Sequence, residues 1–220
     1  MARSRDQLEE VRTSCRSPEK HLSLSIDLLE LKELQSGVKK ALEFLGGLDV
    51  VLHAAGGGLG LKDDFLSSED FQKLFMLNVG AAAEINRLVT PHMKEARSGN
   101  LVHIGSIASS EAVGSVGYNT VKAALSAYVR SIGRALAPFN IIATGILPGG
   151  FISPGNAMAR LHTKNPEAYA RFIEERLPRK VMGDAEELIP MLTLLCSDGA
   201  SMMGGCLVPI DAGEGRCIIV

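Results

Sequence analysis

The sequence of 220 residues has no tryptophan, and aromatic residues make up only 5% of it. Its apolar runs, such as the stretch 141–147, are too short to span a bilayer. Residues 1–10 contain no apolar signal-peptide core. We therefore expect a protein that makes no membrane contact and is cytoplasmic.

The two signs of charge are nearly balanced. Lysine and arginine number 23 against 25 acidic residues, and no basic stripe is present, so nothing indicates nucleic-acid binding. The four cysteines form no CxxC pair and have no metal-ligand spacing; they are Cys15, Cys196, Cys206 and Cys217. They predict ordinary thiols in a reducing compartment, with no metal site. The expected ligand is a small molecule.

What the sequence does contain is a regular alternation of apolar strands and amphipathic helices. Strands are predicted at 21–27, 49–55, 100–106, 140–147 and 204–211, and helices at 5–14, 28–46, 67–96, 117–137, 165–178 and 184–198. Buried strands that alternate with helices predict an α/β fold with a parallel sheet covered on both faces. We expect one domain over residues 1–220, with ligands bound at the carboxyl ends of the strands.

The glycine-rich stretch 48–60, LDVVLHAAGGGLG, follows a predicted strand and resembles a phosphate-binding loop at first sight. The dinucleotide fingerprint needs GxGxxG, and counted from Gly56 its third glycine falls on Leu61. Asp63 and Asp64 would also bring negative charge close to a phosphate. We therefore interpret the stretch as a later turn that lines a cofactor groove by close approach of its backbone.

Tyr118 and Lys122 are the strongest chemical signal, because they lie four residues apart on a predicted helix. That spacing places the two side chains about 40° apart on one helix face. An ammonium group near a phenol lowers the tyrosine pKa from about 10 and makes the phenol usable as a general acid/base. Ser106, at the end of the preceding strand, could orient a substrate carbonyl.

Several motifs in order give the chain a resemblance to the short-chain dehydrogenase/reductase family. HAAG at 53–56 resembles the family's NNAG turn, and Asn78 in LNVG resembles the tetrad asparagine. Ser106 in HIGS, YNTVK at 118–122 and LPGGFIS at 147–153 resemble the serine, the YxxxK motif and the proline-glycine turn. The resemblance covers essentially all 220 residues and implies a Rossmann-like, doubly wound parallel sheet in three layers.

The family resemblance implies an NAD(P)-dependent oxidoreductase that acts on a carbonyl or a secondary alcohol. Tyr118 would exchange the proton with the substrate oxygen, and Ser106 would hydrogen-bond the carbonyl. Lys122 would lower the tyrosine pKa and bind the nicotinamide ribose. Asn78 would hold a water of a proton relay; the alternative is a helix-kink asparagine that bonds only to the backbone.

Cofactor contacts are also implied by the resemblance. The expected set is Arg3, Asp27, Leu28, His53, Ala54, Ala55, Gly56, Tyr118, Lys122, Pro148, Gly149 and Ile152. Residues 2–5, which resemble the end of the family's second strand, contain arginines and no acid, so NADP is favoured over NAD. For His53 the alternative is a strand-end residue that acts through its backbone.

The chain departs from the family pattern at its start. The family's first strand, its TGxxxGxG loop, the following helix and the second strand have no counterpart here, so the expected fold is N-terminally truncated. Without a central first strand, the strand at 49–55 would expose an apolar edge. Three hypotheses follow: an oxidoreductase, a non-catalytic remnant that pairs with a relative, and a chain that re-pairs its strands and keeps weak activity.

The segment 151–180 is expected to be a substrate lid. Its mixed composition names no substrate, so a sugar, a hydroxy acid, an acyl thioester and a cyclic alcohol all stay open. In the family the counterparts of helices 67–96 and 117–137 pair across a two-fold axis. The resemblance therefore implies a homodimer or homotetramer.

Overall fold

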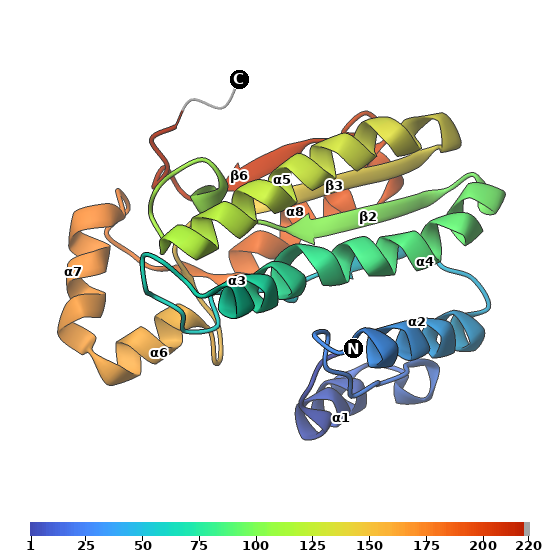
Figure 1. Cartoon of the computed structure of the whole chain (residues 1–220), viewed down its shortest axis with the longest axis horizontal. Coiled ribbons are helices and arrows are strands. Elements are labelled where there is room, and N and C mark those ends of the chain that lie inside the picture. Colours follow the sequence, from blue (N-terminus) through green and yellow to red (C-terminus); the bar gives the residue numbers. More distant parts are fainter. Residues whose placement is uncertain (218–220) are drawn as a thin grey trace.

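A four-stranded parallel sheet forms the centre of the molecule (Figure 1). The computed structural model describes residues 1–217. In the order β1-β2-β3-β6, the strands are Val50–His53, Gly99–Ile104, Ile141–Pro148 and Leu207–Ile210. A second parallel pair joins β4 (Phe151–Ile152) to β5 (Gly183–Asp184). The predicted parallel α/β fold is confirmed.

Helices cover both faces of this sheet. The α-helices of residues 1–217 are α1 (Arg5–Ser14), α2 (Leu31–Leu45), α3 (Ser68–Phe75), α4 (Ala81–Ala96), α5 (Val116–Leu136), α6 (Ala157–Lys164), α7 (Pro166–Arg176) and α8 (Ile189–Leu195), of which α1, α6 and α7 bury no residue. On β2, Leu101 packs with α2 and α4, and its neighbour Val102 packs with α8 on the opposite face. Figure 1 shows α4 and α5 in front of the sheet and α8 behind it. The result is the three-layer arrangement predicted from the sequence.

The predicted helix 67–96 has a local irregularity. Ser67 caps its start, since the Ser67 side chain accepts a hydrogen bond of 3.1 Å from the Asp70 amide. Between α3 and α4 the backbone forms a π-helical turn over Met76–Gly80, in which the Ala81 amide bonds the Met76 carbonyl. Such turns place one extra residue in a helix. Asn78 lies in this turn and is buried.

The N-terminal segment is attached to the rest through helix packing. The predicted strand 21–27 is reduced to a single parallel bridge between Ala2 and Ser25. Among residues 1–217, β1 pairs only with β2, and Leu52 of β1 is 44% exposed. Leu34 and Val38 of α2 pack in one cluster with residues of α4. The N-terminal bridge is therefore held beside the sheet by α2.

The last predicted helix, 184–198, is divided in two. Asp184 caps a 3-10 turn over Ala185–Leu188 in a capping box with Glu187, and α8 follows at once with Pro190 in its first turn.

The helix α6 was not predicted. Within the part of the chain that the structure describes, no helix is long and apolar enough to cross a bilayer.

Candidate active site

The carboxyl ends of β2 and β3 meet at one edge of the sheet. Gly105, just after β2, donates a backbone hydrogen bond of 2.8 Å to the Ile146 carbonyl of β3. Ser106 follows directly and caps a 3-10 turn by accepting a hydrogen bond of 3.2 Å from the Ala108 amide. Helix α5 packs against this turn and against β3. The fold therefore brings Ser106 to the start of the helix that carries Tyr118 and Lys122.

Lys122 is a buried cation, only 3% exposed. Its Nζ donates a hydrogen bond of 3.1 Å to the Ile104 carbonyl at the end of β2. The same Nζ lies 5.6 Å from the centre of the Tyr118 ring. Burial lowers the pKa of Lys122 to about 8, so the side chain is still mostly charged at neutral pH.

The Tyr118 phenol departs from the sequence-based expectation. Burial raises the pKa of Tyr118, and the hydrogen bond with Ser106 lowers it by less than burial raises it. The prediction that Lys122 lowers the pKa of Tyr118 is therefore wrong for the chain without bound cofactor. The reason is geometric: the ammonium lies against the phenol ring and bonds a backbone carbonyl.

Asn78 bonds the glycine-rich turn after β1. Its Oδ1 accepts a hydrogen bond of 3.0 Å from the Gly57 amide, and its Nδ2 donates to the carbonyls of Gly57 and Leu74, at 2.9 Å each. Both amide hydrogens are thus used by backbone groups, as the alternative interpretation of Asn78 expects. A Cβ at Gly56 would lie 2.9 Å from Asn78 Oδ1 and 3.3 Å from Lys122 Nζ. Only glycine fits there, and its backbone lies close to both side chains.

His53 belongs to a buried polar network that the sequence analysis missed. Its Nε2 bonds Asn86 Oδ1 at 2.7 Å, and Asn86 Nδ2 bonds His103 Nε2 at 3.2 Å and the Tyr128 hydroxyl at 3.1 Å. His103 Nδ1 donates to the Thr144 carbonyl at 3.0 Å. The missed signal was the strand register, which pairs His53 with His103.

The other expected cofactor residues divide into two groups. Pro148 and Gly149 lie at the same sheet edge as Ser106, with Ala54 and Ala55 just before Gly56 and Ile152 in β4. Arg3, Asp27 and Leu28 lie instead in the N-terminal segment beside the Ala2–Ser25 bridge. There Asp27 Oδ1 accepts from the Leu29 amide at 2.9 Å, Leu28 packs on the core, and Arg3 is exposed.

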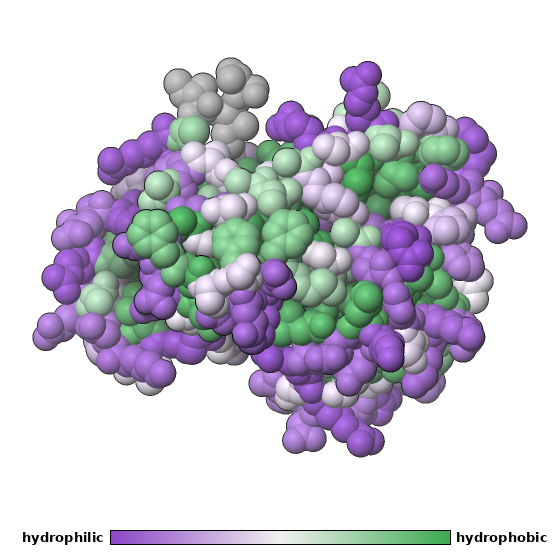
Figure 2. All heavy atoms as spheres, in the orientation of Figure 1, coloured by the Kyte–Doolittle hydropathy of each residue, from purple (hydrophilic) through white to green (hydrophobic). Residues whose placement is uncertain are grey.

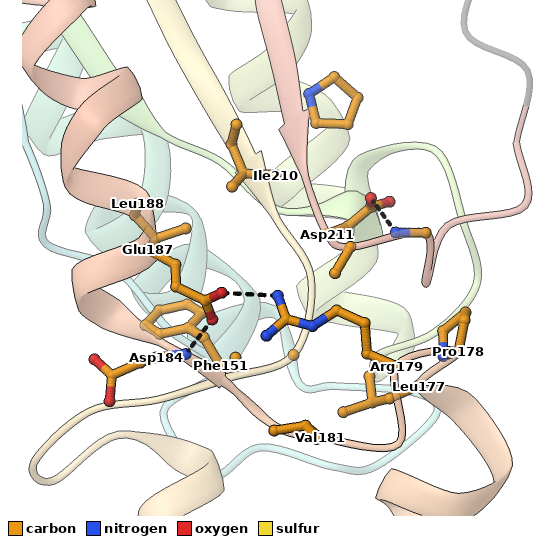
Figure 3. A pocket seen from close by; sticks show the side chains of 15 residues that line it. Phe151, Leu177, Pro178, Arg179, Val181, Asp184, Glu187, Leu188, Ile210 and Asp211 are labelled. Atoms are coloured by element: carbon orange, nitrogen blue, oxygen red, sulfur yellow. Dashed lines mark hydrogen bonds and ion pairs between the residues drawn. The ribbon is translucent and has the colours of Figure 1, made fainter.

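A cavity of about 410 Å³ lies beside Gly150, in the loop after β3 (Figure 3). Its wall combines the apolar side chains of Phe151, Leu177, Leu188 and Ile210 with the charged groups of Arg179, Asp184, Glu187 and Asp211. In Figure 3 the Arg179 guanidinium points across it to Glu187, with 2.7 Å between Nη1 and Oε1. Ser106, Tyr118 and Lys122 do not line it. The cavity is therefore separate from the cluster around Tyr118.

Comparison with known proteins finds relatives over nearly the whole chain. A family described as enoyl-(acyl carrier protein) reductase matches residues 1–214. An uncharacterized oxidoreductase of Thermotoga maritima is 31% identical over 190 residues, which cover 83% of this chain and 73% of that protein. The 7alpha-hydroxysteroid dehydrogenase of Escherichia coli K12 is 28% identical over 188 residues, 85% of this chain and 71% of that one.

A solved structure shows the same fold. YwfH, described as an NADPH-dependent reductase involved in bacilysin biosynthesis, superposes with a TM-score of 0.87 at 23% identity. The superposition covers 99% of this chain and 87% of that one.

Proposed function

Because the chain belongs to the short-chain dehydrogenase/reductase family of oxidoreductases, we propose that it interconverts a carbonyl and a secondary alcohol with NAD(P), and that Tyr118 is the general acid/base. The observation that carries this proposal is the buried Lys122 ammonium. It lies against the Tyr118 ring and beside the backbone of Gly56, at the carboxyl end of a parallel sheet. Burial of a cation in this way costs stability, and a buried, perturbed group of this kind favours a functional role.

The residues at this edge fit a nicotinamide nucleotide. Gly56 leaves no room for a side chain, and a Cβ at Gly58 would lie 3.9 Å from the Tyr118 ring. At Gly56 that room is taken by Asn78 and Lys122, whereas the missing side chain at Gly58 leaves space beside the Tyr118 ring for a flat ring or a ribose. Lys122 has N–H groups beyond the one that bonds Ile104, and these can donate to ribose hydroxyls. The nicotinamide, when bound, donates or accepts the hydride.

The acid/base roles follow from the protonation states. The raised pKa of Tyr118 keeps the phenol protonated at neutral pH, so it can donate a proton to a carbonyl oxygen. The Ser106 hydroxyl lies beside the same phenol and can donate to that oxygen as well. Asn78 fixes the turn at Gly57, and through it the wall beside Lys122. This arrangement favours carbonyl reduction at neutral pH.

NADP is the proposed nucleotide, with NAD as the alternative. The exposed Arg3 lies in the N-terminal segment with no acidic neighbour in residues 2–5. A guanidinium suits a 2′-phosphate, whereas an acid at this place would hold a 2′-hydroxyl. Asp27 is engaged by the Leu29 amide and keeps oxygen lone pairs for an adenine amino group.

The proposed oligomer is a homodimer or homotetramer built on the face of α3, α4 and α5. Figure 2 shows apolar side chains gathered across this face. Phe65 is 97% exposed, and Phe75 and Val116 are also exposed. Apolar surface of this kind is typical of protein interfaces. The single domain and the lid over 151–180 are part of the same proposal.

Fluorescence titration with NADPH and NADH tests the proposed function. We expect micromolar binding of NADPH, weaker binding of NADH, and loss of binding in Lys122→Met. Lys40→Met, on the exposed side of α2, is the matched control and keeps binding.

The second candidate is a non-catalytic subunit that pairs with a relative. The observation in its favour is β1, which pairs only with β2 among the described residues. Absence of nucleotide binding by the folded wild-type chain would decide for this candidate.

A further inference from the structure

The carboxylate of Glu214 is buried, with its side chain only 3% exposed. Glu214 lies in the C-terminal turn, by which we mean residues Asp211–Cys217 after β6. Asp211 shapes the turn, since its two carboxylate oxygens accept from the amides of Gly213 and Gly215 at 3.0 Å each. A buried carboxylate needs partners that satisfy both oxygens, and Glu214 finds them outside its own turn.

One oxygen bonds the loop after β3. The Gly150 amide donates to Glu214 Oε2 at 2.5 Å. A Cβ at Gly149 would lie 2.7 Å from the same oxygen, so the loop passes directly over the carboxylate. Gly150 follows Pro148 and Gly149, which the family resemblance implies as cofactor contacts.

The other oxygen bonds helix α7. Arg176, in the last turn of α7, donates from Nη2 to Glu214 Oε1 at 2.6 Å. The Arg176 Nη1 also donates to the Val113 carbonyl at 3.4 Å, and Val113 lies in the loop between Ser106 and Tyr118. Phe172, one turn earlier, lies under the Arg176 guanidinium and close to Gly150.

A second acid attaches the same turn to the Ser106–Tyr118 loop. Glu111 Oε1 accepts from the amides of Arg216 and Cys217, at 2.6 Å and 3.1 Å. A Cβ at Gly215 would lie 2.8 Å from this oxygen, so the contact is close along the backbone. The C-terminal turn thus joins three segments that border the site: the loop 110–115, the loop at Gly150, and α7.

We propose that Glu214 is a positioning residue, whose carboxylate holds α7 and the Gly150 loop at one fixed distance from Ser106 and Tyr118. Glu214 acts through Arg176 and the Gly150 amide and needs no contact with the reacting atoms. The pair Glu214–Arg176 then decides how firmly the segment 151–180 closes over the site. This inference rests on the proposed function for its effect on the reaction, but the attachment of α7 is a property of the free chain.

Hydrogen exchange of the free chain, read by mass spectrometry, tests the attachment. Glu214→Ala and Arg176→Met are expected to raise exchange of the α7 amides about tenfold or more relative to the rest of the chain. Glu175→Gln and Arg171→Met are matched controls, because both residues are exposed on the same helix, and their exchange stays unchanged. An equal rise over the whole chain would show a general loss of stability and would overturn the proposal.

Steady-state kinetics on the same variants tests the positioning role. We expect kcat/KM for the carbonyl substrate to fall about 10- to 100-fold in Glu214→Gln and Arg176→Met, because misplaced groups react slowly. The NADPH dissociation constant should stay within about threefold, and Arg176→Lys should recover part of the loss. Unchanged kcat/KM with a released α7 would overturn the role of Glu214. A wild-type chain that transfers no hydride would overturn the proposed function and this kinetic role together, whereas the exchange data would still report the attachment.

Discussion

The imidazole rings of His53 and His103 stack with their centroids 4.6 Å apart, at paired positions of β1 and β2. Burial lowers the pKa of His53 to about 4. Burial, together with repulsion from His53 in its protonated form, lowers the pKa of His103 to about 3. His103 donates from Nδ1 to a carbonyl and accepts at Nε2 from Asn86, so protonation would place two donors face to face. Both rings are therefore neutral in the folded chain near pH 7.

The chain should lose stability in mild acid for this reason. Both folded-state pKa values lie below the ordinary value of about 6.5, so the unfolded chain takes up protons first as the pH falls below about 6.5. Each histidine should remove about 1.6 kcal/mol from the free energy of unfolding between pH 6.5 and pH 5. Urea unfolding at several pH values measures this loss.

His53→Asn should reduce that pH dependence by about half, because one of the two stacked rings is removed. His21→Asn replaces an exposed histidine and should leave the pH dependence as it is. Equal pH dependence in His53→Asn and in the wild type would contradict the neutral stacked pair.

Tyr118→Phe removes one oxygen and keeps the ring against Lys122. We expect the turnover number to fall about 100- to 10,000-fold, the usual contribution of a general acid/base. Nucleotide binding should persist, since Lys122 and Gly56 are untouched. Steady-state turnover and NADPH titration on the same preparation measure both quantities. A variant that keeps wild-type turnover would assign the proton transfer to another group.

Gly56→Ala introduces a methyl group 2.9 Å from Asn78 Oδ1 and 3.3 Å from Lys122 Nζ. The free energy of unfolding should fall by about 1–3 kcal/mol, as for other overpacked sites. Activity should fall further, by about 100-fold, because the shift moves Lys122 itself. Gly47→Ala, where a Cβ has no atom within 4 Å, is the control for both measurements. A loss of stability with full activity would show that Lys122 tolerates displacement.

Gly133→Ala tests the contact of α5 with the segment before β6. A Cβ there would overlap the Gly205 nitrogen and lie 2.5 Å from its Cα, and these are backbone atoms rather than the end of a flexible side chain. The overlap should outweigh the gain of about 1 kcal/mol in helix propensity. We expect a net loss of about 1–3 kcal/mol in thermal or urea unfolding.

Gly204→Ala is the neighbouring control for that prediction. A Cβ at Gly204 meets its nearest atom at an ordinary 3.7 Å. Its stability should stay close to that of the wild type. Equal free energies of unfolding for Gly133→Ala and Gly204→Ala would contradict the close packing of α5 against Gly205.

The sequence predicted the parts of the fold and site that depend on regular spacing. Tyr118 and Lys122 were found because four residues make about one helical turn, and the strands were found from their continuous apolar runs. The buried histidine network was missed, because it depends on strand register, which local patterns do not report. The direction of the Tyr118 pKa shift was missed because burial and the position of an ammonium are tertiary properties.

No local sequence pattern indicated that Glu214 has a structural role. Its partners Gly150 and Arg176 are separated from it by 64 and 38 residues, so no local spacing relates them. The π-helical turn at Met76–Gly80 was anticipated only as the alternative of a helix kink at Asn78, because the apolar spacing on both sides fits an ordinary helix.

That π-helical turn also has a consequence for insertions and deletions. Its extra residue turns Asn78 toward Gly57 and still allows Leu74 before it and Ile85 after it to be buried. Because the turn takes up one extra residue, removal of one residue between Met76 and Gly80 would restore a regular α-helix and leave α3 and α4 at nearly the same relative rotation. Both helices would keep their buried faces, but Asn78 would lose its place opposite Gly57. The extra residue therefore serves the contact between Asn78 and the turn at Gly57 rather than the packing of the two helices.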